Sequence, residues 1–241
     1  MSWEKRRWRG APCWVNPRWW SDGLGHAFLG RLDRSDSTAS ALQTVAEGVH
    51  APVCALSQMH SAQVVNAAQI PSPHQGPCQI QADALLITRR ELQQGVQCFA
   101  VVTADCAPVI ISGHQRIALV HAGWRGIAGG IVERALECVG SRAVEVVVGP
   151  CAGPSSYEVG AEVLEALGSR AIYRPSTSGR LLLSLPESIA GIARGLGAHV
   201  ELLGDDTMSD PAYFSHRRGE KGRNVTLIGA AELLEPLFDR S

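Results

Sequence analysis

The sequence lacks several features that would assign a function class directly. Its formal net charge is -1, from 22 Lys and Arg against 23 Asp and Glu, so no overall positive field favours nucleic acid or anionic lipid. No apolar run is long enough to span a membrane, and the amino-terminal MSWEKRRWRG has no apolar signal core. We therefore expect a cytoplasmic protein that binds neither nucleic acid nor a membrane, with its seven cysteines as free thiols.

Several nucleotide and metal motifs are also absent. There is no GxxxxGK[ST] phosphate loop, and HAGWRGIAGG does not have the GxGxxG order of a dinucleotide site. In GPCAGPS, Pro154 stands where the zinc-deaminase pattern needs its second cysteine. The eight histidines form no HxH pair, so a multi-copper cluster cannot be assembled in the usual way. NTPase, nicotinamide-dependent and multi-copper chemistry are therefore not expected.

Strand-like and helix-like segments alternate along the chain, which predicts the α/β class. We expect one domain over residues 1–241, a mixed sheet with flanking helices and some antiparallel edges, in which a Trp/Arg-rich segment (1–22) precedes a core (23–230). The amino-terminal tryptophans suit packing over the domain, although a membrane-surface or single-strand nucleic-acid arm is an alternative. Strands are predicted at 99–103, 117–120, VEVVVG and HVELLG, helices at 35–49, 126–139, 161–167 and 187–196, a surface loop at IPSPHQGPCQ, and two extended pieces in AYFSHRRGEKGRNVTLIGA.

Cys106 and His121 each lie at the end of an apolar, strand-like run, CFAVVTADCAPVIIS and RIALVHAGWRG. Reactive side chains of α/β enzymes are commonly presented at strand ends. With a third ligand such as His60, they would offer Zn²⁺ one thiolate and two imidazoles and leave a fourth position open. The three are far apart in the sequence, so spacing alone leaves a second interpretation open, in which Cys106 is a small buried residue and the histidines are structural.

The neighbours of these residues also bear on the interpretation. Glycines surround His121 in HAGWRG, and Trp124 and Arg125 follow it, a combination suited to close approach by a ligand. Asp105 precedes Cys106 and is a candidate to orient a histidine ligand or raise its basicity. A solvated turn carboxylate is the alternative for Asp105.

Six segments in this order resemble the YfiH-like family: SQMHSAQVV, QADALLIT, TADCAPVII, LVHAGWRG, VGPCAGPSSYEVG and AYFSHRRGEKGR. The family is also described as multicopper polyphenol oxidoreductase (laccase) proteins or laccase-domain-containing purine nucleoside phosphorylases. The resemblance runs from about residue 25 to 228. It implies a YfiH-like α/β fold, one Zn²⁺ held by two histidines and a cysteine, and purine nucleoside phosphorolysis with adenosine deamination. When the family's ligand motifs are matched to this sequence, the resemblance implies that the metal ligands are His60, Cys106 and His121.

The chain departs from the family pattern around the expected substrate rim. Arg31 matches an amino-terminal arginine of the family, but LDRSD follows it in place of a Gly-Gly-x-Ser stretch. Asp206 stands where relatives commonly carry cysteine, and His216 where they carry tyrosine. The metal ligands are kept, so these departures concern substrate preference.

Arginines are the residues expected to bind phosphate and ribose, since phosphorolysis brings an anion to a cationic transition state. Arg31 and Arg223 are preferred because both lie in motif context, and Phe214 is a candidate to stack on the purine. The alternative for each is an ordinary solvated charge or an inward-facing aromatic. The full set of candidate arginines is Arg31, Arg125, Arg217, Arg218 and Arg223.

The expected function is therefore zinc-dependent cleavage of adenosine, inosine or methylthioadenosine by phosphate, giving the base and ribose 1-phosphate, with accompanying adenosine deaminase activity. Copper is set aside because the histidines are scattered. Two other classes stay open. One is a metal-free cysteine hydrolase or amidase, for example on cell-wall precursors, with Cys106 as nucleophile and His121 as base. The other is a non-catalytic metal-binding protein.

Overall fold

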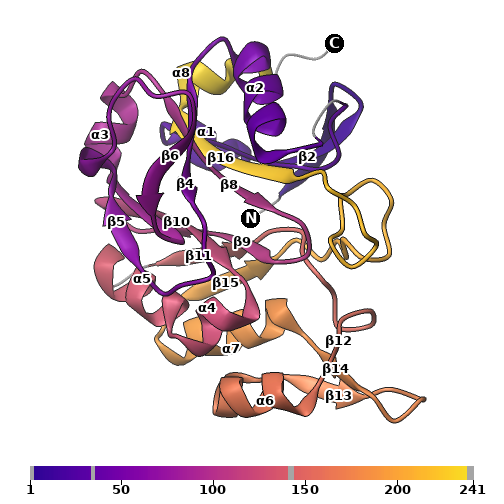
Figure 1. The fold of residues 1–241 in the computed structure, drawn as a ribbon. Helices are drawn as coiled ribbons and strands as arrows, with labels where there is room; N and C mark the ends of the chain where they lie inside the picture. Colours follow the sequence, from indigo (N-terminus) through magenta and orange to yellow (C-terminus); the bar gives the residue numbers. More distant parts are fainter. Residues whose placement is uncertain (1–2, 34–35, 141–143, 238–241) are drawn as a thin grey trace.

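Two sheets stack between layers of helices in the computed structural model, which describes residues 3–33, 36–140 and 144–237 (Figure 1). The seven-stranded sheet has the order β1 (Glu4–Trp8), β2 (Ala11–Val15), β3 (Leu24–Leu29), β16 (Asn224–Ala230), β8 (Cys98–Thr103), β4 (Val53–Ser57), β6 (Gly76–Gln81). The six-stranded sheet has the order β15 (His199–Leu202), β11 (Glu145–Val148), β9 (Ala107–Ser112), β10 (Arg116–Ala122), β7 (Ala84–Thr88), β5 (Val64–Asn66).

A third, three-stranded sheet lies with α6 at the lower edge of the molecule in Figure 1. Its order is β12 (Glu158–Val159), β14 (Leu181–Leu183), β13 (Tyr173–Pro175). The helices are α1 (Pro17–Ser21), α2 (Thr38–Val49), α3 (Arg89–Gln94), α4 (Trp124–Ala128), α5 (Ile131–Val139), α6 (Ala161–Leu167), α7 (Leu185–Gly195) and α8 (Ala231–Leu234), with 3-10 turns η1 (Ala67–Gln69), η2 (Gly168–Arg170) and η3 (Glu235–Leu237). Among the described residues, no helix is both long and apolar enough to cross a bilayer.

The alternation of side chains along each strand explains the layers. In β8, Phe99 and Val101 belong to the apolar cluster between the two large sheets, while Ala100 and Val102 pack with α2 on the other face. In β9, Ile110 likewise faces the space between the sheets, and its neighbours pack with α5 and α7. Strands covered on both faces read as continuous apolar runs, which is why these two segments were recognisable in the sequence.

The sheets are mixed, and the expected antiparallel edge is present where β1 pairs with β2. Antiparallel pairs occupy the centres of both large sheets, as in β16 with β3 and β8, and in β9 with β10. The parallel pairs lie toward the edges: β4 with β6 and β8, β5 with β7, and β11 with β15. A short link of residues 113–115 joins β9 to β10 as a hairpin, which only antiparallel strands allow.

Three expected elements were wrong in part. The predicted loop IPSPHQGPCQ contains the start of β6, where Pro77 is tolerated because β6 is an edge strand. The predicted helix over 126–139 is two helices, because Gly130 has φ +85°, a left-handed conformation that interrupts helix geometry. Residues 212–223 form turns and loop rather than a first extended piece. The predicted helix over 35–49 is α2, which begins at Thr38 after the cap Ser37, and Ser35 lies outside the described residues.

The amino-terminal tryptophans pack against the domain as the preferred interpretation expected. Residues 4–15 form β1 and β2, which extend the seven-stranded sheet. Trp3 contacts Trp19 edge to face at a centroid distance of 5.4 Å, and it contacts His26 at 5.2 Å. Trp14 Nε1 donates to Asp205 at 2.7 Å, which ties this segment to the loop that follows β15.

His26 makes the stability of this region depend on pH. Burial lowers the pKa of its imidazole to about 4, although Nδ1 donates to Leu24 O, and Nε2 accepts from Asn16 N. The unfolded chain therefore binds the proton at higher pH than the folded chain. We expect the free energy of unfolding to fall by about 2 kcal/mol between pH 7 and pH 5, measured by urea denaturation.

The matched variants are His26→Gln, which removes this titration, and His114→Gln at an exposed position. His26→Gln lowers stability at pH 7 but flattens its dependence on pH, whereas His114→Gln retains the slope of the wild type. An unchanged slope in His26→Gln contradicts the assignment.

Candidate metal centre and its cavity

Two of the three proposed ligands lie on connections that cross from the seven-stranded to the six-stranded sheet. Residues 58–63 connect β4 to β5 and carry His60, and residues 104–106 connect β8 to β9 and carry Cys106. Since β4 and β8 are parallel neighbours, both connections leave the sheet at the same end. The topology thus brings His60 and Cys106 together although they are distant in sequence.

The third residue, His121, lies near the end of β10, where its Cα is paired with Pro108 of β9. It is 3% exposed. Its Nδ1 bonds to the Asp83 carboxylate at 2.8 Å, and its backbone N donates to Asp83 O at 2.7 Å. This contact fixes the ring and leaves Nε2 for a ligand.

Asp83 also organises the connection that carries His60. Its carboxylate accepts from the backbone N of His60 at 3.0 Å, from Ser61 N at 2.6 Å, from Ser61 Oγ at 2.7 Å and from Met59 N at 3.2 Å. His60 has φ +62°, in the left-handed region that costs a non-glycine residue energy unless its surroundings hold it. One buried carboxylate therefore holds both histidines.

The three ligand atoms form one compact group. His60, Cys106 and His121 each place a ligand atom within 4.8 Å of the others, and Cys106 Sγ lies 3.7 Å from His60 Nε2. A sulfur and a nitrogen bound to Zn²⁺ at about 2.3 and 2.0 Å in tetrahedral geometry lie roughly 3.5 Å apart. The group therefore fits a zinc ion. A Cβ at Gly123 would lie 2.9 Å from both Cys106 Sγ and His60 Cδ2, so any larger residue there would displace one of these two ligands.

The same contacts set the charges of the metal-free site. Burial by itself would raise the pKa of the Cys106 thiol, but hydrogen bonds with His121 and His60 outweigh burial and lower the pKa to about 6. Burial would lower the pKa of His121, whereas its bonds to Asp83 and Cys106 raise the pKa to about 9. Burial would raise the pKa of Asp83, and bonds from His121 and Ser61 bring the pKa down to about 2. Without metal, the site holds a thiolate beside an imidazolium.

The ligand group opens onto a cavity of about 1070 Å³. Its walls come from the seven-stranded sheet, from α4 and from the segment that leads through β12 into α6. Trp124 and Tyr157 supply aromatic surface, and the Arg125 and Arg217 guanidinium groups lie over these rings at 4.3 and 5.0 Å. This volume is at the upper end of what small-molecule sites usually have.

Asp105 does not orient a histidine, as the sequence expectation had it. It is 6% exposed, and its carboxylate accepts from Thr207 Oγ1 at 2.9 Å, Ser215 Oγ at 3.0 Å and Arg217 N at 2.8 Å. Its contacts therefore join the connection that carries Cys106 to the loop before β16. The bond to a histidine is made by Asp83 instead.

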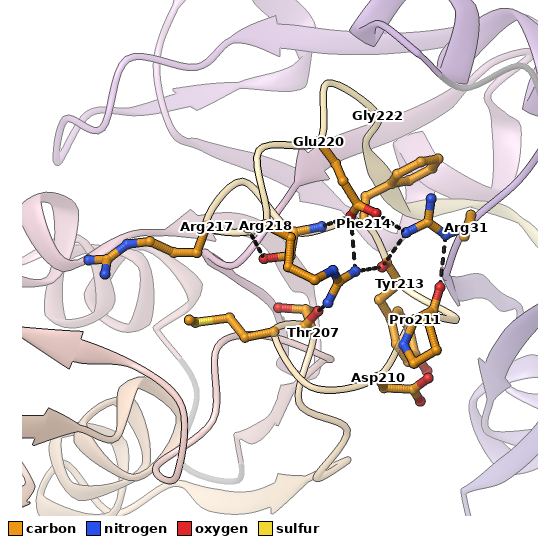
Figure 2. Close-up of polar contacts among 12 residues, drawn as sticks. Arg31, Thr207, Asp210, Pro211, Tyr213, Phe214, Arg217, Arg218, Glu220 and Gly222 are labelled. Atoms are coloured by element: carbon orange, nitrogen blue, oxygen red, sulfur yellow. Dashed lines mark hydrogen bonds and ion pairs between the residues drawn. The ribbon is translucent and has the colours of Figure 1, made fainter. Parts of the chain in front are cut away.

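That loop has a second anchor, drawn in Figure 2. Arg31 and Arg218 converge on the Glu220 carboxylate, and both also donate to Tyr213 O, while Arg217 points away from this cluster. Arg31 Nε donates in addition to Pro211 O at 2.8 Å. The guanidinium of Arg31 is thereby engaged by protein oxygens.

The expected substrate residues separate into two groups. Arg31 and Phe214 are not among the described residues that line the cavity; Arg31 stacks over the Phe214 ring at 4.2 Å, and Asn224 bonds to both the N and the O of Phe214. Their contacts stabilise the loop rather than face a ligand. Arg223 does line the cavity, together with Arg125 and Arg217. Arg218 is bound to Thr207 O, Tyr213 O and Glu220.

The structure also shows the surroundings of two positions where the chain departs from the family pattern. Asp206 accepts from Gly153 N at 3.0 Å, Met208 N at 2.9 Å and Ser156 Oγ at 2.5 Å, which ties the segment after β11 to the loop. His216 lines the cavity. The role of Asp83 was not predicted from the sequence, although its position in QADALLIT, a carboxylate directly before a buried strand, was a usable signal.

Comparisons with known proteins point to one family. A family model described as multi-copper polyphenol oxidoreductase laccase matches residues 28–231. A Xylella fastidiosa protein named purine nucleoside phosphorylase is 31% identical over 191 residues, covering 71% of this chain and 70% of its own length. A Pseudomonas aeruginosa protein of the same name is 37% identical over 151 residues, covering 56% of this chain and 60% of its own. The chain thus spans less than two thirds of the Pseudomonas relative.

Solved structures share the fold over almost the whole chain. A Neisseria meningitidis protein superposes with a TM-score of 0.73 at 25% identity, covering 95% of this chain and 99% of that one. YlmD from Geobacillus stearothermophilus superposes with a TM-score of 0.71 at 21% identity, covering 94% and 98%. The sequence prediction of a YfiH-like α/β fold is confirmed, and YfiH from Bacillus licheniformis has the same fold, with a TM-score of 0.73 at 20% identity over 90% of this chain and 96% of that one.

Proposed function

The chain belongs to the family of multi-copper polyphenol oxidoreductase laccase proteins, and on that premise we propose that it is a zinc-dependent purine nucleoside phosphorylase. The proposed substrates are adenosine, inosine and methylthioadenosine with phosphate, and the products are the base and ribose 1-phosphate, or its methylthio analogue. Adenosine deaminase activity is proposed as an accompanying reaction. The relatives' names support the phosphorylase assignment.

One observation carries the proposal: His60, Cys106 and His121 converge at the wall of a cavity that arginines also line. A thiolate and two imidazoles are a donor set that Zn²⁺ accepts. When bound there, zinc supplies Lewis-acid polarisation of a reacting oxygen. Copper-based oxidation of phenols is not supported by this group, since multi-copper sites need many more imidazoles than the two here.

The arginines of the cavity supply the anion site. Arg180 is paired with Glu158 at 2.6 Å. Arg125, Arg217 and Arg223 contact aromatic rings and carbonyl oxygens in the described part of the chain, without an ion pair to a carboxylate. Their positive charge is therefore open to a ligand. We assign phosphate to Arg217 and Arg223 in particular, because both line the cavity and Arg223 also lies in the family motif.

The chemistry follows from these charges. Phosphate oxygen attacks C1′ of the ribose as the bond from C1′ to N9 breaks, through a transition state with positive charge on the sugar. The arginines hold the phosphate dianion next to that developing cation. The attraction between the two charges lowers the activation barrier. Trp124 and Tyr157 offer faces on which the purine can stack. Arg31 and Phe214 act through the loop and do not contact substrate.

The test is chromatography of adenosine, inosine and methylthioadenosine incubated with and without phosphate, with metal analysis of protein purified without added metal. We expect release of base only with phosphate, the matching pentose 1-phosphate as co-product, conversion of part of the adenosine to inosine, and about one zinc per chain. Release of free base without phosphate identifies a hydrolase and contradicts the proposal.

The metal-free cysteine enzyme is the second candidate, favoured by the thiolate and imidazolium of Cys106 and His121. It requires purified protein without zinc and full loss of activity when one thiol is alkylated. A cytoplasmic location, and the absence of nucleic-acid and membrane partners, stay predictions.

A further inference from the structure

The leaving purine needs a proton in the proposed phosphorolysis, and this inference rests on that proposed function. When the bond to N9 breaks, the electron pair enters the imidazole ring of the purine. Protonation at N7 neutralises the charge and makes the base a better leaving group, which is the task of a general acid. The metal ligands and arginines of the cavity do not perform it: the ligands are committed to the ion, and guanidinium is too weak an acid.

His216 is placed for that task. Its side chain lines the same cavity as the three ligands, and among the contacts of the described residues none involves its imidazole. The preceding residue, Ser215, donates to Asp105, and the following residue, Arg217, donates its N to Asp105 at 2.8 Å. Glu220, held by Arg31 and Arg218, accepts from Ser215 N at 2.7 Å. The backbone on both sides of His216 is therefore anchored while its ring stays available.

Apart from Glu162, the other acid–base groups among the described residues that line the cavity already have partners. The carboxylate of Asp105 receives three donors, and that of Glu158 is bound by Arg180. The Glu162 carboxylate folds against its own helix start, where a Cβ at Gly160 would lie 2.0 Å from it. Arg217 lies over Tyr157. Imidazole is also the side chain that most often transfers protons near neutral pH.

We infer that His216 is the catalytic acid that protonates N7 of the departing purine. The C1′–O bond to phosphate forms, the C1′–N9 bond breaks, and the imidazolium of His216 gives its proton to N7. The hydrogen phosphate brought one proton into the site. The phosphate ester releases that proton to the imidazole, directly or through water, so the enzyme returns to its starting state and charge is balanced.

A nucleoside that needs no proton at N7 tests this role. In 7-methylguanosine, N7 is methylated and positively charged, so the base leaves as a neutral molecule without an acid. We expect His216→Gln to lower kcat for inosine about a hundredfold or more, and kcat for 7-methylguanosine less than about threefold. His216→Asn should show the same split, and His114→Gln, at an exposed position, should leave both substrates unchanged.

Turnover of 7-methylguanosine also reports that the variants are folded and hold metal. Equal loss on both substrates, with zinc content retained, overturns the inference and makes His216 a structural residue of the loop. Unchanged inosine cleavage overturns it as well. If the wild-type protein cleaves neither nucleoside with phosphate, the proposed function itself fails, an outcome distinct from a failure of His216 alone.

Discussion

Cys106→Ala is expected to remove the bound metal and to abolish nucleoside turnover. Cys106 supplies the only sulfur of the three-residue group, and without it two imidazoles remain, one of them on the exposed residue His60. Loss of an outer partner of a ligand typically costs roughly 10- to 100-fold in metal affinity or activity, and loss of a ligand itself costs more. Zinc per chain, measured by elemental analysis, and the rate of phosphate-dependent base release are the two readouts.

Cys151→Ala is the matched control, because Cys151 is also a cysteine near the site but is fully packed in the core beside α7. Burial raises the pKa of its thiol above the usual range, so it is not a thiolate donor. This variant should keep both zinc and turnover. Zinc at wild-type stoichiometry in Cys106→Ala would contradict the ligand assignment.

The same site gives the metal-stripped protein a distinct reactivity. With a pKa of about 6, Cys106 is mostly thiolate at pH 7, so its alkylation by iodoacetamide should rise as the pH passes through 6. Added zinc should suppress this reaction, because the thiolate is then a ligand. Alkylation that zinc does not slow would favour the cysteine-hydrolase alternative.

Asp83→Asn is expected to weaken zinc binding about 10- to 100-fold although Asp83 does not touch the metal. The carboxylate accepts from three backbone N–H groups, from Ser61 Oγ and from the ring of His121. An amide offers these donors one acceptor oxygen instead of two and turns its NH₂ toward some of them, so the contact that orients His121 is weakened. Unsatisfied buried groups should also cost about 1–3 kcal/mol of unfolding free energy. Competition with a chromogenic chelator and urea denaturation measure the two effects.

Asp205→Asn separates metal binding from general stability. Asp205 is a partly buried carboxylate with its own donors, Lys5 at 2.7 Å, Trp14 at 2.7 Å and the Tyr213 hydroxyl, and it is not part of the ligand group. Its substitution should lower stability and leave zinc affinity unchanged. If Asp83→Asn loses stability but binds zinc as the wild type does, Asp83 has no role in positioning the ligands.

Prediction from the sequence is most accurate where a segment is covered on both faces. The runs at β8, β9 and β10 are apolar without interruption because each packs between two layers, and their identification placed Cys106 and His121 at strand ends. It is least accurate where the backbone is held by side chains. The segment 212–223 looks extended in sequence, but Asp105, Glu220 and Asn224 hold it in turns. These contacts produce no periodic pattern of apolar and polar residues in the sequence.

The α/β class, the family resemblance and the three residues that converge can be read from the sequence, because apolar periodicity and motif letters are local properties of the chain. It takes the three-dimensional fold to show that Asp83, and not Asp105, binds His121, and that Arg31 anchors a loop while Arg223 faces the cavity. Those assignments depend on how the two sheets stack and on which connections leave them at the same edge. Hydrogen-bond partners 38 or 189 residues apart are chosen by that geometry, and no local pattern encodes it.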